Sequence, residues 1–261
     1  RPAAPGFCMT GTARLPKAEL HCHIEGAASP ALIRRAAARN GIVLPVGLFT
    51  ADDRYAWRDF NSFLAAYDQA SACLSRPSDY RELVCGYLGA CAGEGALYVE
   101  IFSSPDHAAA VGMSYIEHLA GLVQGIEDAE RDFGILARII VVCLRHLGPE
   151  RAVDVARAAA GTPHPYVVGF GMAGDELQYQ AAEFRPAFRI ADAAGLGCTA
   201  HAGEVGGPES VRAAIDQLPV SRIGHGVRAS EDPALLRDLA RRGIVLEVCP
   251  GSNLALGLYA D

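Results

Sequence analysis

The 261-residue sequence lacks the signatures of several common protein classes. No stretch approaches the roughly 18 uninterrupted apolar residues that a membrane-spanning helix needs. The formal net charge of −7 comes without a basic segment, which argues against binding nucleic acid through a basic surface. The opening segment RPAAPGFCMTGTAR has no apolar core of a signal peptide. We therefore predict a cytoplasmic protein without membrane or nucleic-acid partners, and the sequence leaves its oligomeric state open.

C-x-x-C pairs are absent, and lysine is scarce. None of the eight cysteines forms a C-x-x-C pair. With 51% hydrophobic residues, a chain this long can build a core without a disulfide framework, so we expect reduced, mostly buried cysteines. The 23 basic side chains include one lysine, Lys17, which becomes informative once a metal site is considered.

Short, nearly unbroken apolar runs recur along the sequence and are typical of strands buried on both faces of a parallel sheet. They predict strands at residues 18–23, 96–102, 137–144, 166–172, 197–203, 222–226 and 243–250. Amphipathic segments lie between them, and several start at a proline in the first helical position or at a capping serine. Such starts occur at Ser29-Pro30, Ser114, Pro149 and Pro208, and the segment 42–95 holds further helices.

The alternation of strands and helices predicts an α/β fold. Polar residues gather at the predicted ends of different strands, where a (β/α)8 barrel of TIM type collects its chemistry. They are His21, His23, Glu100, His201, Glu204, His225 and Asn253. No G-x-G-x-x-G follows the first strand, which disfavours an open dinucleotide-binding sheet. We predict a single barrel domain over residues 1–261, with seven of the usual eight strands visible.

The segment PKAELHCHIEG places His21 and His23 two positions apart at the end of the first predicted strand. Side chains with this spacing on a strand point the same way, so the two imidazoles can share one metal ion. From these residues alone, a hydrogen-bonded histidine pair remains an alternative.

Two further motifs extend the pattern. TAHAGE carries His201 at another strand end and Glu204 in the following loop, and RIGHG places His225 between two glycines that permit close approach. Taken singly, Glu204 could be a carboxylate at a helix start and His225 an ordinary turn residue. Four histidines at three strand ends are hard to explain by packing, and they predict a metal centre with a carboxylate that moves protons.

The sequence favours one metal ion over two. Barrel hydrolases with two ions commonly bridge them with a modified lysine, and Lys17 lies beside the first histidine pair rather than on a middle strand. H-E-x-x-H is absent, and so is the P-C-x-x-C that the cytidine-deaminase type of zinc site requires.

Five motifs, in order and spacing, resemble the adenosine deaminase family of the amidohydrolase superfamily: PKAELHCHIEG, VVGFGMAGDE, TAHAGEVGGPESV, RIGHGV and LEVCPGSN. The resemblance runs from about residue 15 to residue 258, nearly the whole chain. It implies a (β/α)8 barrel with one Zn²⁺ per chain and a small purine substrate. The implied reaction is hydrolysis at C6, in which hydroxide adds to the ring and ammonia leaves.

The resemblance also implies roles for the matching residues. His21, His23 and His201 would ligate zinc. Glu204 would donate a proton to the ring nitrogen N1, which makes C6 more electrophilic. His225 would orient the attacking hydroxide and assist charge stabilisation.

The substrate is less clearly indicated. The resemblance implies that Gly174 makes a backbone contact to the purine, and that His23 and Glu25 face the substrate. Adenosine-specific members usually carry Asp, which contacts the ribose, where this chain has Glu25. AGDE and RIGHG nevertheless resemble the nucleoside branch, since adenine-type members tend toward DSSE and RIDHG. We expect adenosine or deoxyadenosine as the substrate, with an adenine deaminase, an aminodeoxyfutalosine-type deaminase and a non-catalytic relative as alternatives.

One family feature has no match in the sequence. The family continues to an eighth strand with an Asp-Asp pair, in which the first aspartate ligates zinc and the second contacts N7 of the purine. Asp261 does not fit that motif. We therefore expect the 261 residues to be a portion of a longer polypeptide, and we do not expect this portion alone to be a competent enzyme.

Overall fold

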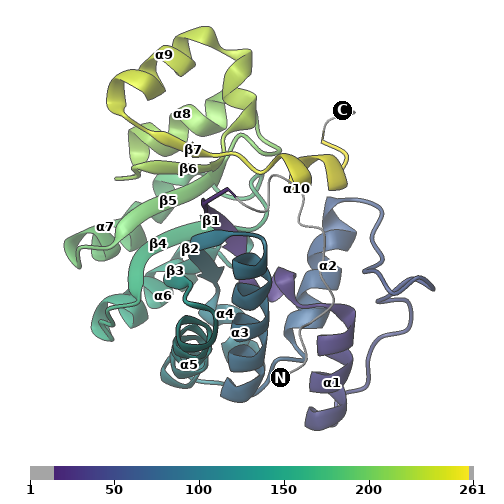
Figure 1. The fold of residues 1–261 in the computed structure, drawn as a ribbon. Coiled ribbons are helices and arrows are strands. Elements are labelled where there is room, and N and C mark those ends of the chain that lie inside the picture. The colour runs from purple at the N-terminus through teal and green to yellow at the C-terminus, as the bar shows by residue number, and fades with distance from the viewer. Residues whose placement is uncertain (1–14, 259–261) are drawn as a thin grey trace.

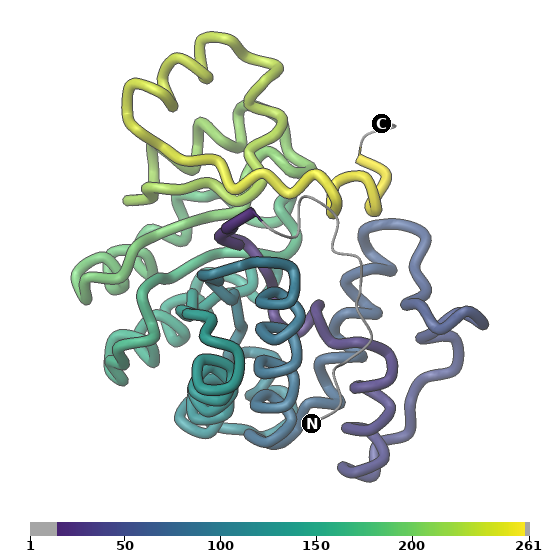
Figure 2. Tube along the Cα trace, in the orientation of Figure 1, coloured from purple at the N-terminus to yellow at the C-terminus, as the bar shows by residue number. Residues whose placement is uncertain are grey.

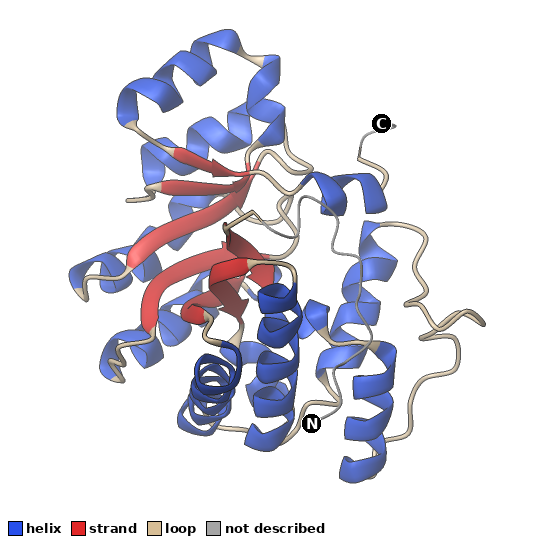
Figure 3. Cartoon of the chain, viewed as in Figure 1, coloured by secondary structure: helices blue, strands red, loops and turns tan. Residues whose placement is uncertain are grey.

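The computed structural model describes residues 15–258 of the chain. Within them lie seven strands: β1 (Lys17–His23), β2 (Ala96–Ser103), β3 (Leu136–Leu144), β4 (Val167–Ala173), β5 (Gly197–Ala202), β6 (Arg222–His225) and β7 (Val245–Glu247). All pair in parallel and in chain order, and the sheet curls into a nearly closed barrel with helices around its outer face (Figures 1 and 3). This is the TIM-type α/β architecture that the sequence predicts.

Ten α-helices and four short 3₁₀ helices connect the strands of the described region. The α-helices are α1 (Pro30–Asn40), α2 (Phe60–Ser71), α3 (Pro77–Gly93), α4 (Pro105–Ala110), α5 (Tyr115–Phe133), α6 (Pro149–Gly161), α7 (Arg185–Ala193), α8 (Pro208–Gln217), α9 (Pro233–Arg242) and α10 (Pro250–Ala255). The 3₁₀ helices are η2 (Ile24–Ala27), η3 (Arg145–Leu147), η4 (Ala181–Phe184) and η5 (Val227–Glu231). None of these helices is long and apolar enough to cross a membrane.

The helix starts follow the local sequence. The Ser29 side chain accepts a hydrogen bond from the Leu32 amide at the start of α1, and Pro30 occupies the first turn. Ser114 and Glu117 form the predicted capping box of α5, in which each side chain accepts the backbone N–H of the other residue. These signals depend only on neighbouring residues, so the helices begin where the sequence predicts.

The two faces of the sheet carry different apolar clusters. Successive strand residues point to opposite faces, so Ile139 packs under the helices, whereas Ile140 and Val142 join Phe102 in a smaller cluster inside the barrel. The Phe102 ring lies 4.4 Å from the ring of His21, between centroids. The inner cluster therefore packs directly against the histidines at the barrel mouth.

A glycine makes room for the large side chains inside the barrel. A Cβ atom on Gly169 of β4 would lie 2.5 Å from Cδ1 of Ile140, which is closer than side-chain atoms approach. The glycine therefore allows a large branched side chain to occupy the barrel interior.

β1 and β7 are the two edges of the sheet, and they do not pair with each other within residues 15–258. Figure 2 traces the first and last strands close together, at the point where the ring of strands is open. A hydrogen bond of 2.8 Å from His21 Nδ1 to Glu247 Oε2 spans this opening.

Three expectations need correction. The sequence predicts the last strand at 243–250, but the strand ends at Glu247, because Pro250 opens α10 three residues after the end of the short β7. Glu100 does not join the histidines, since it lies within β2 and forms an ion pair of 2.7 Å with Arg222.

The seven described cysteines are unpaired, as expected, but only Cys73, Cys143 and Cys198 among them are fully buried. Cys8 lies outside the described residues.

Candidate active site

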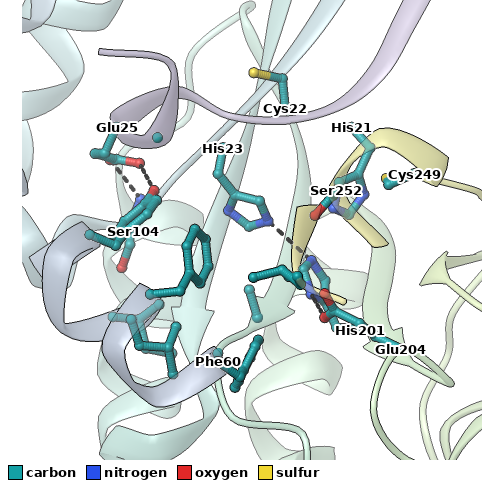
Figure 4. A pocket seen from close by; sticks show the side chains of 18 of the residues that line it. His21, Cys22, His23, Glu25, Phe60, Ser104, His201, Glu204, Cys249 and Ser252 are labelled. Carbon is teal, nitrogen blue, oxygen red and sulfur yellow. Dashed lines mark hydrogen bonds and ion pairs between the residues drawn. The ribbon is translucent and has the colours of Figure 1, made fainter. Parts of the chain in front are cut away.

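A cavity of about 420 Å³ opens at the C-terminal ends of the strands. Its wall includes every residue that the sequence singled out as catalytic, substrate-binding or metal-ligating: His21, His23, Glu25, Gly174, His201, Glu204 and His225. In Figure 4, His21, His201 and Glu204 lie on one side, Glu25 and Ser104 lie on the other, and His23 lies between them. The fold thus brings together residues of β1, β5 and β6 with residues of the segments that follow β1, β4 and β5.

The four imidazoles form one compact group. Nitrogen atoms of His21, His201 and His225 all lie within 4.8 Å of one another. His23 Nε2 lies 3.1 Å from His201 Nε2, as the dashed line in Figure 4 marks. Two ring nitrogens this close either share a proton or face a common cation.

His21 is oriented by a carboxylate. Its Nδ1 lies 2.8 Å from Glu247 Oε2, and Thr199 Oγ1 donates to the same oxygen over 3.0 Å. A carboxylate only accepts, so Nδ1 carries the proton and the lone pair of Nε2 faces the other imidazoles without a partner. Arg222 lies 3.0 Å from the other oxygen of Glu247 and balances its charge. Metal-binding histidines typically have such a carboxylate behind them.

His225 is held from the opposite side. Its Nδ1 donates to Oδ1 of Asn253 over 2.9 Å, which leaves the Nε2 lone pair toward the cavity. Its backbone has a φ of 62°, in the left-handed region that residues other than glycine rarely adopt. Such a strained conformation at a strand end persists where the surroundings fix it, and it often marks a functional site.

Gly224 makes space for the imidazole group. A Cβ atom at this position would lie 2.7 Å from His201 Cδ2 and 2.9 Å from His21 Cε1. The first glycine of RIGHG therefore allows two rings to lie against the backbone of β6. The sequence predicted close approach here, and the structure shows that the approaching groups are the histidines.

The electrostatic state of the group suits a divalent cation. Burial lowers the pKa of both His23 and His201 well below the usual histidine value, and the neighbouring imidazoles lower it further. Burial, and next His21, also lower the pKa of His225 to about 4. Neutral imidazoles with converging lone pairs are metal ligands. The unpartnered Nε2 of His21 and the carboxylate behind its ring therefore fit a metal ion at this point.

Glu204 is the acidic residue on the side of the cavity where the imidazoles lie. Its Oε2 lies 3.6 Å from His201 Nδ1 and 3.5 Å from His225 Nε2. Burial, and next the charge of Glu176, raise the pKa of the Glu204 carboxyl to about 7. A buried carboxylic acid that titrates near neutrality can donate a proton to a bound molecule.

Glu25 faces the cavity from the other side, but its oxygens are already engaged. Oε1 accepts from Ser103 Oγ over 2.6 Å and from the Ser104 amide over 3.3 Å, while Oε2 accepts from the Tyr67 hydroxyl over 2.8 Å. At 2% exposure, the carboxylate is held in a polar cage. It is therefore fixed in place more firmly than an exposed substrate-binding carboxylate would be.

Helix α2 supplies an apolar side of the cavity through Phe60, Phe63 and Leu64. Gly174, with a φ of 94°, lies just after β4, and a Cβ atom there would be 2.6 Å from His146 Nδ1. The segment 42–95, whose role the sequence left open, thus contributes directly to the wall.

Sequence reasoning missed Glu247 and Glu176. Both lie in motifs that it quoted, but their partners are distant in sequence. A charged residue within the short apolar run of β7 was nevertheless a signal, because burying a carboxylate is costly unless it is paired.

Comparison with known proteins identifies the family. A sequence model of the family described as adenosine deaminase matches residues 16–261. The chain belongs to the adenosine deaminase family. It is therefore a hydrolase of the amidohydrolase superfamily that acts on a C–N bond of an aminopurine.

Two similar proteins of known sequence are adenine deaminases. An adenine deaminase of Chelativorans sp. (strain BNC1) is 50% identical over 94% of this chain and 75% of its own length. An adenine deaminase of Agrobacterium fabrum is 48% identical over 96% of this chain and 76% of its own length. Adenine, the alternative in the sequence-based prediction, is thus better supported than a nucleoside.

Solved structures show the same fold. The crystal structure of an adenine deaminase from Arthrobacter aurescens matches with a TM-score of 0.87 at 32% identity, covering 94% of this chain and 75% of that one. An amidohydrolase from Burkhoderia ambifaria, solved with bound zinc, matches with a TM-score of 0.85 at 32% identity, covering 96% of this chain and 71% of that one. A zinc-bound relative with this fold and the imidazole group of this chain indicate a metal site.

Proposed function

We propose that the protein to which this barrel domain belongs catalyses the zinc-dependent hydrolytic deamination of adenine to hypoxanthine and ammonia. The placement of Glu204 carries the proposal. It is a buried acid with a pKa raised to about 7, within 3.6 Å of two imidazoles in the same cavity. This arrangement supplies a proton donor beside a site for an activated water.

In the proposed site, His21, His23 and His201 would hold one zinc ion. When bound, the ion would lower the pKa of a water molecule toward neutrality and so supply the nucleophile. Glu247 keeps the His21 ring in the tautomer whose Nε2 lone pair faces the site.

The side chains then handle the protons. Glu204, protonated, donates to N1 of the purine and makes C6 electrophilic. His225, whose Nδ1 proton is held by Asn253, offers its Nε2 lone pair to the water that adds to C6. The proton that His225 takes from the water passes to the leaving amine, so that breaking the C6–N bond releases ammonia. The proton of the new C6 hydroxyl returns to Glu204 as the carbonyl forms, and backbone at Gly174 contacts the ring.

Two observations favour the free base over a nucleoside. The 50% and 48% identical relatives are both adenine deaminases. The carboxylate of Glu25, which stands where adenosine-specific members bind ribose, has its oxygens committed to Tyr67, Ser103 and Ser104. A ribose hydroxyl would have to compete with these bonds.

The first experiment is a substrate panel in the full-length protein, with ammonia release measured for adenine, adenosine, deoxyadenosine and aminodeoxyfutalosine. We expect kcat/KM for adenine to exceed that of the nucleosides by about 10²-fold, the scale on which a shaped pocket discriminates. A higher kcat/KM for adenosine would overturn the choice of adenine and restore the nucleoside assignment.

The second experiment tests the acid. Glu204→Gln keeps the shape of the side chain and removes the proton donor, so we expect kcat to fall about 10²- to 10⁴-fold while one zinc per chain remains by elemental analysis. The matched control is Glu209→Gln, an exposed glutamate at the start of α8, which we expect to keep normal turnover. Retained turnover in Glu204→Gln would remove Glu204 from this role.

A further inference from the structure

One buried carboxylate of the AGDE motif takes no part in the proposed chemistry. Glu176 lies three residues beyond the end of β4, is 5% exposed, and is not among the residues that line the cavity. Its own backbone is fixed, because Arg145 Nη1 donates to its carbonyl oxygen over 2.6 Å. A buried charge that neither binds substrate nor faces the histidines needs another explanation.

The carboxylate of Glu176 binds the backbone of the loop that follows β5. Oε1 accepts the amide of Gly203 over 2.5 Å, and Oε2 accepts the amides of Glu204, Val205 and Gly206 over 3.1, 2.8 and 2.8 Å. Four successive N–H groups thus converge on one carboxylate, which is the geometry of an anion-binding backbone nest.

A side chain completes this arrangement. Ser210 of α8 donates its hydroxyl to Oε1 over 2.5 Å. Burial by itself would raise the pKa of Glu176, but the bonds from Ser210 and the backbone amides outweigh it and lower the pKa below its usual value. Glu176 is therefore a carboxylate anion that is stabilised by the loop amides and by the Ser210 hydroxyl.

The loop has the shape that this contact requires. Gly203 has a φ of 70°, a left-handed conformation that glycine adopts without strain. A Cβ atom on Gly206 would lie 2.7 Å from Glu176 Oε1, so a larger residue would push the carboxylate away. Gly203 and Gly206, two of the three glycines of the AGEVGG segment, thus serve the close approach of one anion.

We propose that Glu176 is a positioning residue for Glu204: by binding the amides of residues 203–206 it sets where the Glu204 carboxyl stands relative to His201 and His225. Glu204 lies in the middle of the bound segment and its own amide is one of the donors. The inference rests on the proposed function, because it concerns the placement of the proposed acid. Shifts of about 1 Å in a reacting group can cost about 10²-fold in rate.

The test uses Glu176→Gln in the zinc-loaded, full-length protein. A glutamine keeps the length of the side chain, but its amide presents N–H groups to N–H groups and cannot accept all five bonds. We expect kcat for adenine to fall about 10- to 100-fold with KM changed less than about 3-fold, zinc content unchanged, and amide exchange at residues 203–206 faster by about 10-fold or more. Glu183→Gln, an exposed glutamate that caps η4, is the control and should change none of these.

A second variant disrupts the contact between Glu176 and the loop by changing the loop. Gly206→Ala inserts the Cβ that meets Glu176 Oε1, and we expect the same fall in kcat with KM retained. This variant keeps the proposal testable if Glu176→Gln does not fold. Glu176→Asp retains the charge and should recover part of the lost kcat, which a merely structural carboxylate would not do.

The outcomes distinguish the positioning role of Glu176 from the proposed deaminase function. Normal kcat in both variants, or unchanged amide exchange at residues 203–206, would overturn the positioning role even if adenine is turned over by the wild type. A wild-type protein that deaminates no aminopurine would overturn the proposed function instead. Amide exchange in Glu176→Gln would then decide whether Glu176 holds the loop, with unchanged exchange again overturning it.

Discussion

His118 shows how deeply the polar cage of Glu25 extends into the protein. The imidazole is 1% exposed, and its Nε2 lies 2.9 Å from the hydroxyl of Ser103, which in turn donates to Glu25. The ring of Tyr80 packs edge-on against it at 4.5 Å, and its Nδ1 has no hydrogen-bond partner. Burial, and next the charge of His107, lower the pKa of His118 to about 3.

This histidine makes stability depend on pH. The unfolded chain protonates His118 below about 6.5, whereas the folded protein keeps it neutral down to about 3. The unfolded state therefore binds more protons in this window, so the contribution of His118 is complete above about pH 6.5 and is lost as the pH falls toward 3. The largest slope from one such group is about 1.4 kcal/mol per pH unit.

We expect urea unfolding between about pH 7 and pH 5 to show a smaller loss of stability in His118→Gln than in the wild type. The other buried histidines titrate in both proteins, so the difference between the two curves isolates His118. Parallel curves would mean that His118 is not held neutral in the folded state.

At the residue scale, sequence reasoning found the side chains whose position is set by local spacing. His21 and His23 face one way because they are two apart on a strand, and His201 and His225 end their strands as predicted. Glu247 and Glu176 were not predicted, because their partners lie 226 and 27 to 34 positions away along the chain. Such pairs are fixed by the order and curl of the strands, which a motif does not reveal.

Among the elements, α3 and α5 pack most closely where α5 carries glycine. A Cβ atom on Gly125 would lie 2.7 Å from Val84 Cβ and 2.9 Å from the carbonyl oxygen of Arg81, both on α3. Gly121 is equally constrained, with Pro77 O at 2.5 Å. The two helices therefore approach each other closely at Gly121 and Gly125, where α5 presents no side chain.

This contact reverses the usual effect of replacing glycine in a helix. Gly125→Ala should gain about 1 kcal/mol in helix propensity but force the helices apart, for a net loss of about 1–3 kcal/mol. Gly86→Ala, at an exposed position of α3 with nothing within 4 Å of the new Cβ, should instead stabilise by about 0.5–1 kcal/mol. Urea unfolding measures both free energies, and equal effects of the two substitutions would contradict the packing argument.

At the element scale, prediction was most accurate where capping residues and prolines mark the boundaries, as at α1, α5, α6 and α8. It was least accurate at β7, where an apolar run looked longer than the strand that forms. The four short 3₁₀ helices were not predicted either, because three to five residues carry no recognisable period.

For the whole molecule, the imidazole group joins parts of the barrel that are far apart in the chain. His21 and His23 come from β1, His201 from β5 and His225 from β6. A metal ion bound to the folded site but not to the unfolded chain stabilises the entire fold by mass action.

We therefore expect removal of the metal by a chelator to lower the thermal unfolding midpoint of the full-length protein, by on the order of 10 °C when free zinc is about a thousandfold above its dissociation constant. His21→Ala should show little further shift on chelation. A midpoint that does not respond to chelator in the wild type would contradict metal binding by this group.

The bond between His21 and Glu247 has a consequence for biosynthesis. The two residues are 226 positions apart, so at about 5–20 residues per second the ribosome delivers Glu247 roughly 10–45 s after His21. Until then the first histidine lacks the carboxylate that turns its lone pair inward. We therefore expect a nascent chain to bind a metal ion tightly only after β7 has been translated.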